Sequence, residues 1–147
     1  MKVLLDTGVL GLLVHVNAEL AQPCGEWMQK MLEEGATFVL PEVCDFELRR
    51  SLLKIDSHSS LSRLDALKLA LQFESVTSNT WLRAADVWAD CRKKDKPGKA
   101  DDALDGDVIL IAIAQQLAGA EPLVIATTNV KHLIDYVDAR EWVAISH

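Results

Sequence analysis

Short apolar runs separated by longer helix-like stretches limit the fold of this chain more than any other feature of its sequence. Residues 3–5, 37–40 and 123–126 are such runs, and each is followed at once by a polar residue or a proline. Runs of this length with a breaker at the end are typical of buried strands. Because parallel strands need long, usually helical, connections, the alternation predicts a parallel sheet with residues 3–5 as a central strand.

The stretches between these runs carry apolar residues at helical spacing. Residues 24–34 place Trp27, Met28 and Met31 on one side of a helix, and Gly35 follows as a natural helix end. The same spacing predicts four further helices, and these are expected at residues 44–54, 61–71, 79–88 and 107–118. Another helix is expected directly after the first strand.

The remaining segments are expected to be short strands and loops. The polar residues 56–62 predict a loop, with Ser62 as the cap of the helix that follows. Residues 74–76 and 142–145 are expected to form two further strands. The charged segment 93–102 contains a proline and a glycine, which predicts a surface loop.

Together these elements predict an α/β fold with three layers, α/β/α, around a central parallel sheet of four to five strands. The 147 residues are close to the commonest domain size and suffice to bury a core without disulfides. A single domain spanning residues 1–147 is therefore expected. In such sheets ligands bind outside the carboxyl ends of the strands, and Asp6 lies at one of these ends.

Composition excludes several classes of protein. Half of the residues are hydrophobic and a quarter are charged, as in ordinary globular domains. No stretch approaches the roughly 20 apolar residues that span a bilayer, and the N-terminus lacks the uninterrupted apolar region of a signal peptide. We therefore expect a cytoplasmic protein without a membrane partner. The three cysteines, Cys24, Cys44 and Cys91, are widely spaced and are expected to be reduced packing residues.

The net charge of −7 argues, taken alone, against a protein that binds a polyanion. Carboxylates that hold a metal ion are neutralised by it, however. Basic residues at positions 49, 50 and 54 and in the segment 92–99 either form a local positive surface or are ordinary solvated helix faces. The sequence leaves both interpretations open.

Four polar residues stand at predicted strand ends or on the adjoining helices. Asp6 follows the first strand, Glu47 lies on the helix predicted at residues 44–54, Asp107 opens the apolar helix, and Asn129 follows a later strand. Mg²⁺ and Mn²⁺ prefer oxygen ligands, and converging carboxylates repel one another without a cation. These residues are therefore candidates for a divalent-metal site.

Each of the four also has a purely structural interpretation. Asp6 and Asp107 suit helix caps or first-turn positions, Glu47 suits a surface pair with a neighbouring arginine, and Asn129 suits a turn. The metal site is favoured because Asp6 and Asp107 adjoin wholly apolar segments, where an ionised group needs a partner.

Four segments resemble the PIN-domain family, and within it the VapC-type toxin ribonucleases. Residues 3–10, VLLDTGVL, resemble the opening segment L-D-T-N-V-L, and residues 46–50, FELRR, resemble the segment with the second acid. Residues 107–114, DVILIAIA, resemble D-x-x-I-A-A-x-A, and residues 126–133, ATTNVKHL, resemble T-x-N-x-x-D-F. Their order and spacing match over nearly the whole chain.

The departures from the family pattern concern three positions. Gly8 replaces a common Asn, Asn129 stands where many members carry a fourth Asp, and His132 stands where an acid often follows. These changes bear on a second metal position more than on the first. Thr7 and Thr127 resemble the family's hydroxyl residues that orient the acidic ligands.

The resemblance implies a divalent-metal-dependent endoribonuclease that hydrolyses RNA phosphodiester bonds. In the family's mechanism Mg²⁺ or Mn²⁺, here held by Asp6 and Asp107 with Glu47 nearby, activates water and stabilises charge on the phosphate. Glu47 would orient or deprotonate the water, and Asn129 would assist through its side-chain oxygen. The resemblance further implies a homodimer that is inhibited by a cognate antitoxin protein.

Rival classes of enzyme fit the residues less well. A phosphatase of the haloacid-dehalogenase type needs a second Asp where this chain has Gly8, and the Gly-rich turn of dinucleotide-binding folds is absent. The four histidines are scattered without a cysteine pair, which argues against zinc.

The alternative from another class is a catalytically weak PIN-like scaffold that binds RNA or a protein without cutting. The departures at Gly8, Asn129 and His132 are its support. The RNA target is left open by the sequence, because Trp27 and Trp81, like Trp88, are expected to pack in the core rather than to stack on bases.

Overall fold

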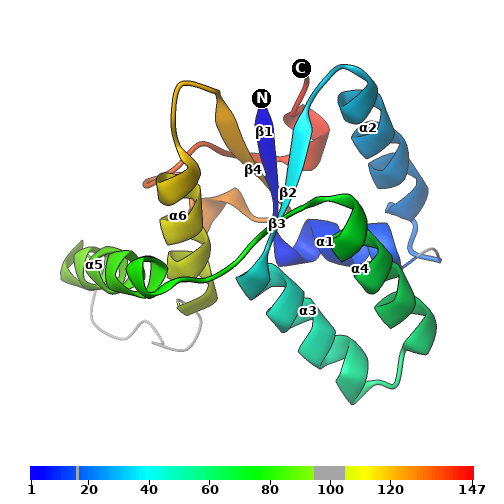
Figure 1. The fold of residues 1–147 in the computed structure, drawn as a ribbon, viewed down its shortest axis with the longest axis horizontal. Helices are drawn as coiled ribbons and strands as arrows, with labels where there is room; N and C mark the ends of the chain where they lie inside the picture. The colour runs from blue at the N-terminus through cyan, green and yellow to red at the C-terminus, as the bar shows by residue number, and fades with distance from the viewer. Residues whose placement is uncertain (16, 95–104) are drawn as a thin grey trace.

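The computed structural model describes residues 1–15, 17–94 and 105–147, which form a five-stranded parallel sheet with helices on both sides (Figure 1). The strands are β1 (Lys2–Leu5), β2 (Thr37–Pro41), β3 (Gln72–Glu74), β4 (Leu123–Thr127) and β5 (Ala139–Glu141). Their order across the sheet is β3-β2-β1-β4-β5. The expected three-layer α/β/α, PIN-like fold is confirmed.

The strand order reverses direction at β1. Leu4 pairs with Val39 of β2 on one side and with Ile125 of β4 on the other, and all three side chains are fully buried. A strand covered on both faces needs this continuous apolar pattern. Ligand sites in open α/β sheets lie outside the carboxyl end of the strand at which the order reverses, and here that strand is β1.

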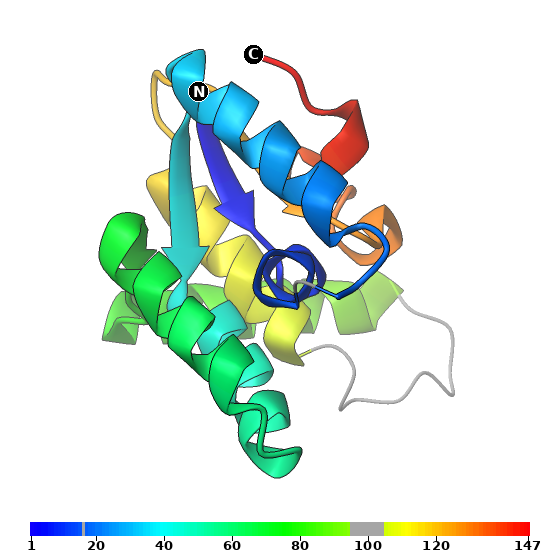
Figure 2. The same ribbon diagram turned by 90° about the vertical axis from the view of Figure 1, so that its right-hand side faces the viewer.

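Six α-helices of the described residues cover the sheet. They are α1 (Thr7–Val14), α2 (Ala21–Glu33), α3 (Glu42–Lys54), α4 (His58–Ala70), α5 (Ser78–Lys94) and α6 (Asp105–Leu117). In Figure 1, α5 and α6 lie to the left of the strands and α1, α2 and α4 to the right. Figure 2 looks onto the second of these faces, with α2 in blue and α4 in green in front of the strands. Gly35, with a φ of 95°, ends the second helix as expected.

Two expectations about the boundaries of helices are wrong. The helix predicted to begin near residue 61 with Ser62 as its cap begins at His58 with Ser57 in the cap position. The polar sequence is tolerated because Ser60 faces inward, and its hydroxyl donates to the carbonyl oxygen of Val14 at 3.3 Å. The loop expected at residues 93–102 is helical as far as Lys94, and the rest of it lies outside the described residues.

The last strand also differs from its prediction. β5 is formed by Ala139–Glu141, and the apolar Trp142–Ala144 makes a 3₁₀ turn instead of a strand. An edge strand is selected by backbone pairing with β4 rather than by apolar side chains. Trp142 is buried against Trp27, with ring centroids 5.7 Å apart, so its apolar character serves the core. The strand expected at residues 74–76 lies two residues earlier, at Gln72–Glu74.

The state of the cysteines and the length of the helices bear on two expectations drawn from the composition. Cys24, Cys44 and Cys91 are free and buried, as expected for packing residues. In the part of the chain that the structure describes, every helix is too short or too polar to cross a membrane.

Candidate active site

Asp6 is fixed at the carboxyl end of the central strand by two short hydrogen bonds. It follows β1 and caps α1, where its Oδ1 accepts from the backbone N–H of Thr7 at 2.7 Å. Its Oδ2 accepts from the Thr127 hydroxyl at 2.6 Å. Bonds to a carboxylate are stronger than neutral ones, so the side chain is held in one orientation. Each oxygen keeps further lone pairs for another partner.

Thr127 joins the first and fourth strands at this point. It ends β4, its side chain is fully buried, and its hydroxyl also accepts from the backbone N–H of Asn129 at 3.0 Å. Thr7 acts differently, because its backbone rather than its hydroxyl contacts Asp6. The Thr7 hydroxyl is buried and, among the residues that the structure describes, has no hydrogen-bond partner.

Glu47 reaches the site from α3 by packing on a glycine of α6. A Cβ atom added at Gly106 would lie only 2.5 Å from Oε1 of Glu47, so no larger residue fits there without moving the carboxylate. Burial and the nearby charge of Asp6 raise the pKa of Glu47, and Arg50 lowers it. Arg49, the other expected partner of Glu47, instead pairs with Asp45 and Asp65.

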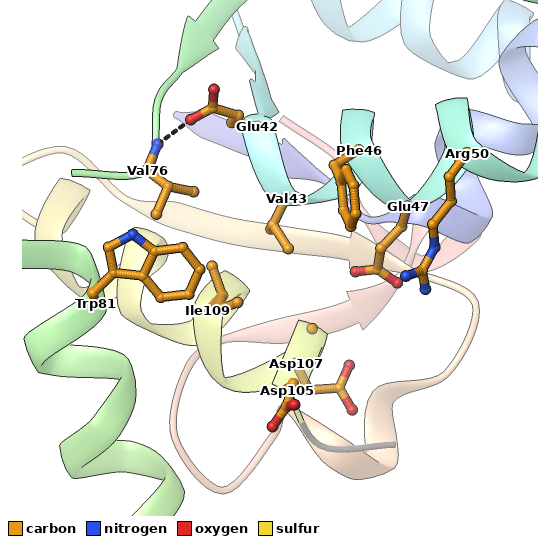
Figure 3. A pocket seen from close by; sticks show the side chains of 11 residues that line it. Glu42, Val43, Phe46, Glu47, Arg50, Val76, Trp81, Asp105, Asp107 and Ile109 are labelled. Carbon is orange, nitrogen blue, oxygen red and sulfur yellow. Dashed lines mark hydrogen bonds between the residues drawn. The ribbon is translucent and has the colours of Figure 1, made fainter. Parts of the chain in front are cut away.

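Asp107 lies in the first turn of α6, opposite Glu47 in Figure 3. Burial raises its pKa above the ordinary value, His132 lowers it, and Asp6 raises it further. Asp6 thus acts electrostatically on both other acids, and Asp107 also raises the pKa of Glu47. The structure therefore brings the three predicted carboxylates into one electrostatic cluster, half-buried at the edge of the sheet.

The chemistry of this cluster suits a hard divalent cation. Its donors are carboxylate oxygens, and mutual repulsion together with burial disfavours their ionised forms, which a cation would relieve. Within residues 1–15, 17–94 and 105–147, no group of three or more His, Cys, Asp or Glu side chains is close enough to enclose a metal ion. Mg²⁺ commonly binds to proteins through one or two carboxylates and keeps several of its waters, so it does not require such an enclosed set.

Asn129 and His132 lie on the loop after β4. Asn129 is exposed, and its side-chain oxygen accepts from the backbone N–H of Lys131 at 3.4 Å, which caps the 3₁₀ turn Val130–His132. Its contact with the acids passes through the hydroxyl of Thr127. His132 is exposed and close enough to affect the pKa of Asp107. The sequence comparison singled out His132 only as a departure, because its proximity to Asp107 is a property of the folded chain.

A cavity of about 850 Å³ adjoins the acids between α3, α5 and α6 (Figure 3). Its lining consists of Glu42, Val43, Phe46, Glu47, Arg50, Val76, Trp81, Asp105, Gly106, Asp107 and Ile109. The prediction that Trp81 packs in the core is wrong, since 57% of its side chain is exposed. Trp27 does pack inside, against Phe38, with ring centroids 5.4 Å apart. Trp88 is partly buried against the core.

Two features of the site were missed at the sequence level. Gly106 lies between Asp105 and Asp107. At the level of sequence, these two acids are alternative caps of the same helix, and the glycine between them has no evident role. Cys44 is buried beside the site. Burial raises the pKa of its thiol most, and the charges of Asp6 and Glu47 raise it further. A thiol that is held protonated in this way is a poor nucleophile.

The fold is that of the VapC toxins, which confirms at the level of fold the resemblance seen in the sequence. VapBC2 from Rickettsia felis, solved with a DNA fragment from the promoter, matches with a TM-score of 0.68 and 15% identity over 97% of this chain and 99% of that chain. VapBC-1 from nontypeable Haemophilus influenzae matches with a TM-score of 0.67 and 15% identity, over 97% of this chain and 99% of that chain. VapC20 of Mycobacterium tuberculosis, a toxin that cleaves the sarcin-ricin loop, matches with a TM-score of 0.64 and 11% identity, over 88% of this chain and 92% of that chain. No model of a protein family and no curated protein matches the chain in sequence.

Proposed function

We propose that this protein is a divalent-metal-dependent endoribonuclease that hydrolyses RNA phosphodiester bonds. The observation that carries the proposal is the cluster of Asp6, Glu47 and Asp107 at the carboxyl end of β1, where the pKa values of Glu47 and Asp107 are raised. Asp6 also caps α1, but the mutual repulsion of three carboxylates at a strand end does not stabilise the fold, whereas a cation turns them into a site for phosphate chemistry.

Asp6, Asp107 and Glu47 would hold the ion, with Mg²⁺ or Mn²⁺ as the natural occupants. Such an ion lowers the pKa of water and stabilises negative charge on a phosphate oxygen. Thr127 holds Oδ2 of Asp6 in position, and the backbone N–H of Thr7 holds Oδ1. Glu47, whose pKa is raised by burial and by the charge of Asp6, would take the proton of the attacking water on its carboxylate. Asn129 is proposed to support the site from the loop after β4.

The biological setting that we propose is a toxin–antitoxin pair in the cytoplasm. Two of the similar solved structures are VapBC assemblies, and VapC20 is described as a cleaving toxin. An antitoxin that covers the acids and a homodimeric state follow from the same analogy, which is one of fold alone. Size-exclusion chromatography with light scattering measures the oligomeric state directly.

A PIN-like scaffold that binds without cutting is the second candidate. The departures at Gly8 and Asn129 favour it, and so does the absence of a closed set of metal ligands among the described residues. Gly8 has a local structural reason, because a Cβ there would clash with the side chain of Thr128 unless that side chain moved. The departure at Gly8 therefore reflects a local contact and does not argue against catalysis.

Incubation of the purified protein with a mixed structured RNA and Mg²⁺ or Mn²⁺ tests the proposal. We expect cleavage by the wild type, none in EDTA, and a loss of at least about a hundredfold in Asp6→Asn and Asp107→Asn, because each removes a ligand of the ion. Asp86→Asn, an exposed acid on α5, is the matched control and should cut normally. Folded wild type that binds the RNA and leaves it intact would favour the scaffold.

A further inference from the structure

We propose that the cavity beside the acids is a binding subsite for an unpaired base of single-stranded RNA, with Trp81 and Phe46 as its stacking walls and Arg50 as its phosphate contact. The inference deepens the proposed function and rests on it for the identity of the nucleic acid. It names the part of the substrate that the chain holds next to the reacting phosphate, and the residues that hold it.

The first observation is the exposure of two large rings in one cavity. Trp81 and Phe46 are 57% and 58% exposed, and both line the cavity next to Glu47 and Asp107. Figure 3 shows the two rings on either side, with Val43 and Ile109 between them. Exposed aromatic rings with an apolar floor match what an unstacked base needs, since every base has a face that stacks.

The second observation is that the backbone next to Trp81 is held in place by hydrogen bonds. Thr80, the neighbouring residue, is buried and its hydroxyl donates to Oε1 of Gln116 on α6 at 2.7 Å. Thr77 hydrogen-bonds to Thr80 through both its backbone N–H and its hydroxyl. Glu42 of α3 accepts from the backbone N–H of Val76, in the segment that precedes α5. A wall fixed in this way loses little entropy when a ligand binds.

The third observation is the placement of charge. The guanidinium of Arg50 lies 5.2 Å from the centroid of the Phe46 ring and lowers the pKa of Glu47, so this cation is close both to one aromatic wall and to the acids. A strand whose base lies between the rings would bring its phosphate toward this cation. Arginine suits phosphate because its donors are fixed in one plane.

A base fits this cavity better than a second copy of the chain does. The carboxylates of Glu42, Glu47, Asp105 and Asp107 line the same cavity as the two rings. An apolar protein surface pressed onto them would bury these charges without partners, which is costly. A single base is small enough that it would cover the two rings without burying these carboxylates.

The test measures binding without cleavage. Two 2′-O-methyl RNA oligomers of eight nucleotides and equal charge are used, one with bases and one abasic. Each is titrated with the protein at low salt in EDTA, and binding is followed by fluorescence anisotropy. The wild type should bind the oligomer with bases more tightly. Trp81→Leu should lose about tenfold of this preference, since a stacked base contributes roughly 1–3 kcal/mol. Trp81→Phe should restore most of it.

Leu82→Ala is the matched control, because Leu82 is exposed on the same helix and does not line the cavity. It should bind both oligomers as the wild type does. Equal preference in the wild type and Trp81→Leu would overturn the inference. Trp81→Leu that changes a dimer into a monomer while its preference stays unchanged would overturn it too and assign the surface to a subunit interface. Binding that depends on bases, in a protein that cuts no RNA with metal, would contradict only the proposed function.

Discussion

At the scale of single residues, the positions of the acids depend on Thr127 and Gly106. The Thr127 hydroxyl donates its one hydrogen to Asp6 and accepts from Asn129, so it orients an acid and ties down the loop after β4. Gly106, in contrast, contributes by lacking a side chain, which leaves room for the Glu47 carboxylate. Both residues act on the acids without taking part in proton transfer.

Thr127→Val should destabilise the fold and reduce cleavage together. Valine keeps the shape and removes the hydroxyl, which leaves the N–H of Asn129 and one oxygen of Asp6 without a buried partner. The free energy of unfolding should fall by about 1–3 kcal/mol, as measured by urea denaturation. Thr127→Ser keeps the hydroxyl and should retain most of the activity. Equal stability of the wild type and the valine variant would show that the two bonds contribute nothing.

Gly106→Ala should separate activity from stability. The added methyl group meets the end of a flexible side chain, so Glu47 can swing away at little cost, and alanine favours the helix by up to about 1 kcal/mol. Cleavage should fall at least about tenfold while the melting temperature stays equal or rises. Gly119→Ala, where a Cβ meets no atom within 4 Å, is the control. Full activity of Gly106→Ala would show that the position of Glu47 is unimportant.

The sequence predicted the acids and Thr127 as residues of the candidate site but not their neighbours. Asp6 and Asp107 adjoin apolar segments in the chain, so an isolated charge signals a site at the level of sequence. Gly106 and His132 become relevant only because α6 and the loop after β4 meet other segments in the folded chain. No pattern within either segment reveals such a meeting.

At the scale of elements, α3 presents two adjacent arginines to different neighbours. Arg49 donates to both oxygens of the buried Asp45, at 3.0 and 2.9 Å, and to Asp65 of α4 at 2.8 Å. These hydrogen bonds raise the pKa of Arg49 above its usual range, chiefly through Asp45. Arg50, one residue on, points to Phe46 and Glu47. The helix α3 thus binds α4 through Arg49 and contributes Arg50 to the candidate site.

Substitution of each arginine by glutamine should separate these tasks. Arg49→Gln leaves Asp45 buried without its cation and should lower the free energy of unfolding by about 2 kcal/mol. Arg50→Gln should leave the stability within about 0.5 kcal/mol of the wild type, as for an exposed residue, and should weaken RNA binding. Thermal melts and anisotropy titrations on the same two variants measure both effects. A reversed pattern would refute the assignment.

The elements foreseen best were those with continuous apolar patterns. β1, β2, β4 and α6 are buried from both sides, so their sequences alone identify them. β5 and the start of α4 were misplaced because backbone pairing with β4 and the contact of Ser60 with Val14 decide them. Such tertiary contacts override local propensity.

At the scale of the whole molecule, the strand order places mutually repelling carboxylates where β1 meets α3 and α6. Burial raises the pKa of Asp107, and Asp6 raises it further. The folded protein therefore keeps the proton to a higher pH than the unfolded chain does. Stability is lost as pH rises through the interval between the two pKa values, and it stays lower above that interval.

Asp107→Asn should therefore stabilise the metal-free protein at neutral pH. In EDTA at pH 7.5 the variant should melt at a higher temperature than the wild type, and the difference should vanish near pH 3, where both states of the wild-type carboxyl are protonated. Asp86→Asn should show no such gain. A lower melting temperature for Asp107→Asn in EDTA at pH 7.5 would show that the carboxylate stabilises the fold.

Binding of Mn²⁺, followed by the loss of the free-ion signal in electron paramagnetic resonance, tests the central claim most directly. The wild type should bind the ion, and Asp6→Asn, Glu47→Gln and Asp107→Asn should each weaken binding by at least about tenfold, while Asp86→Asn binds as the wild type does. Equal affinity in all five proteins would contradict the claim that these three carboxylates form a metal centre.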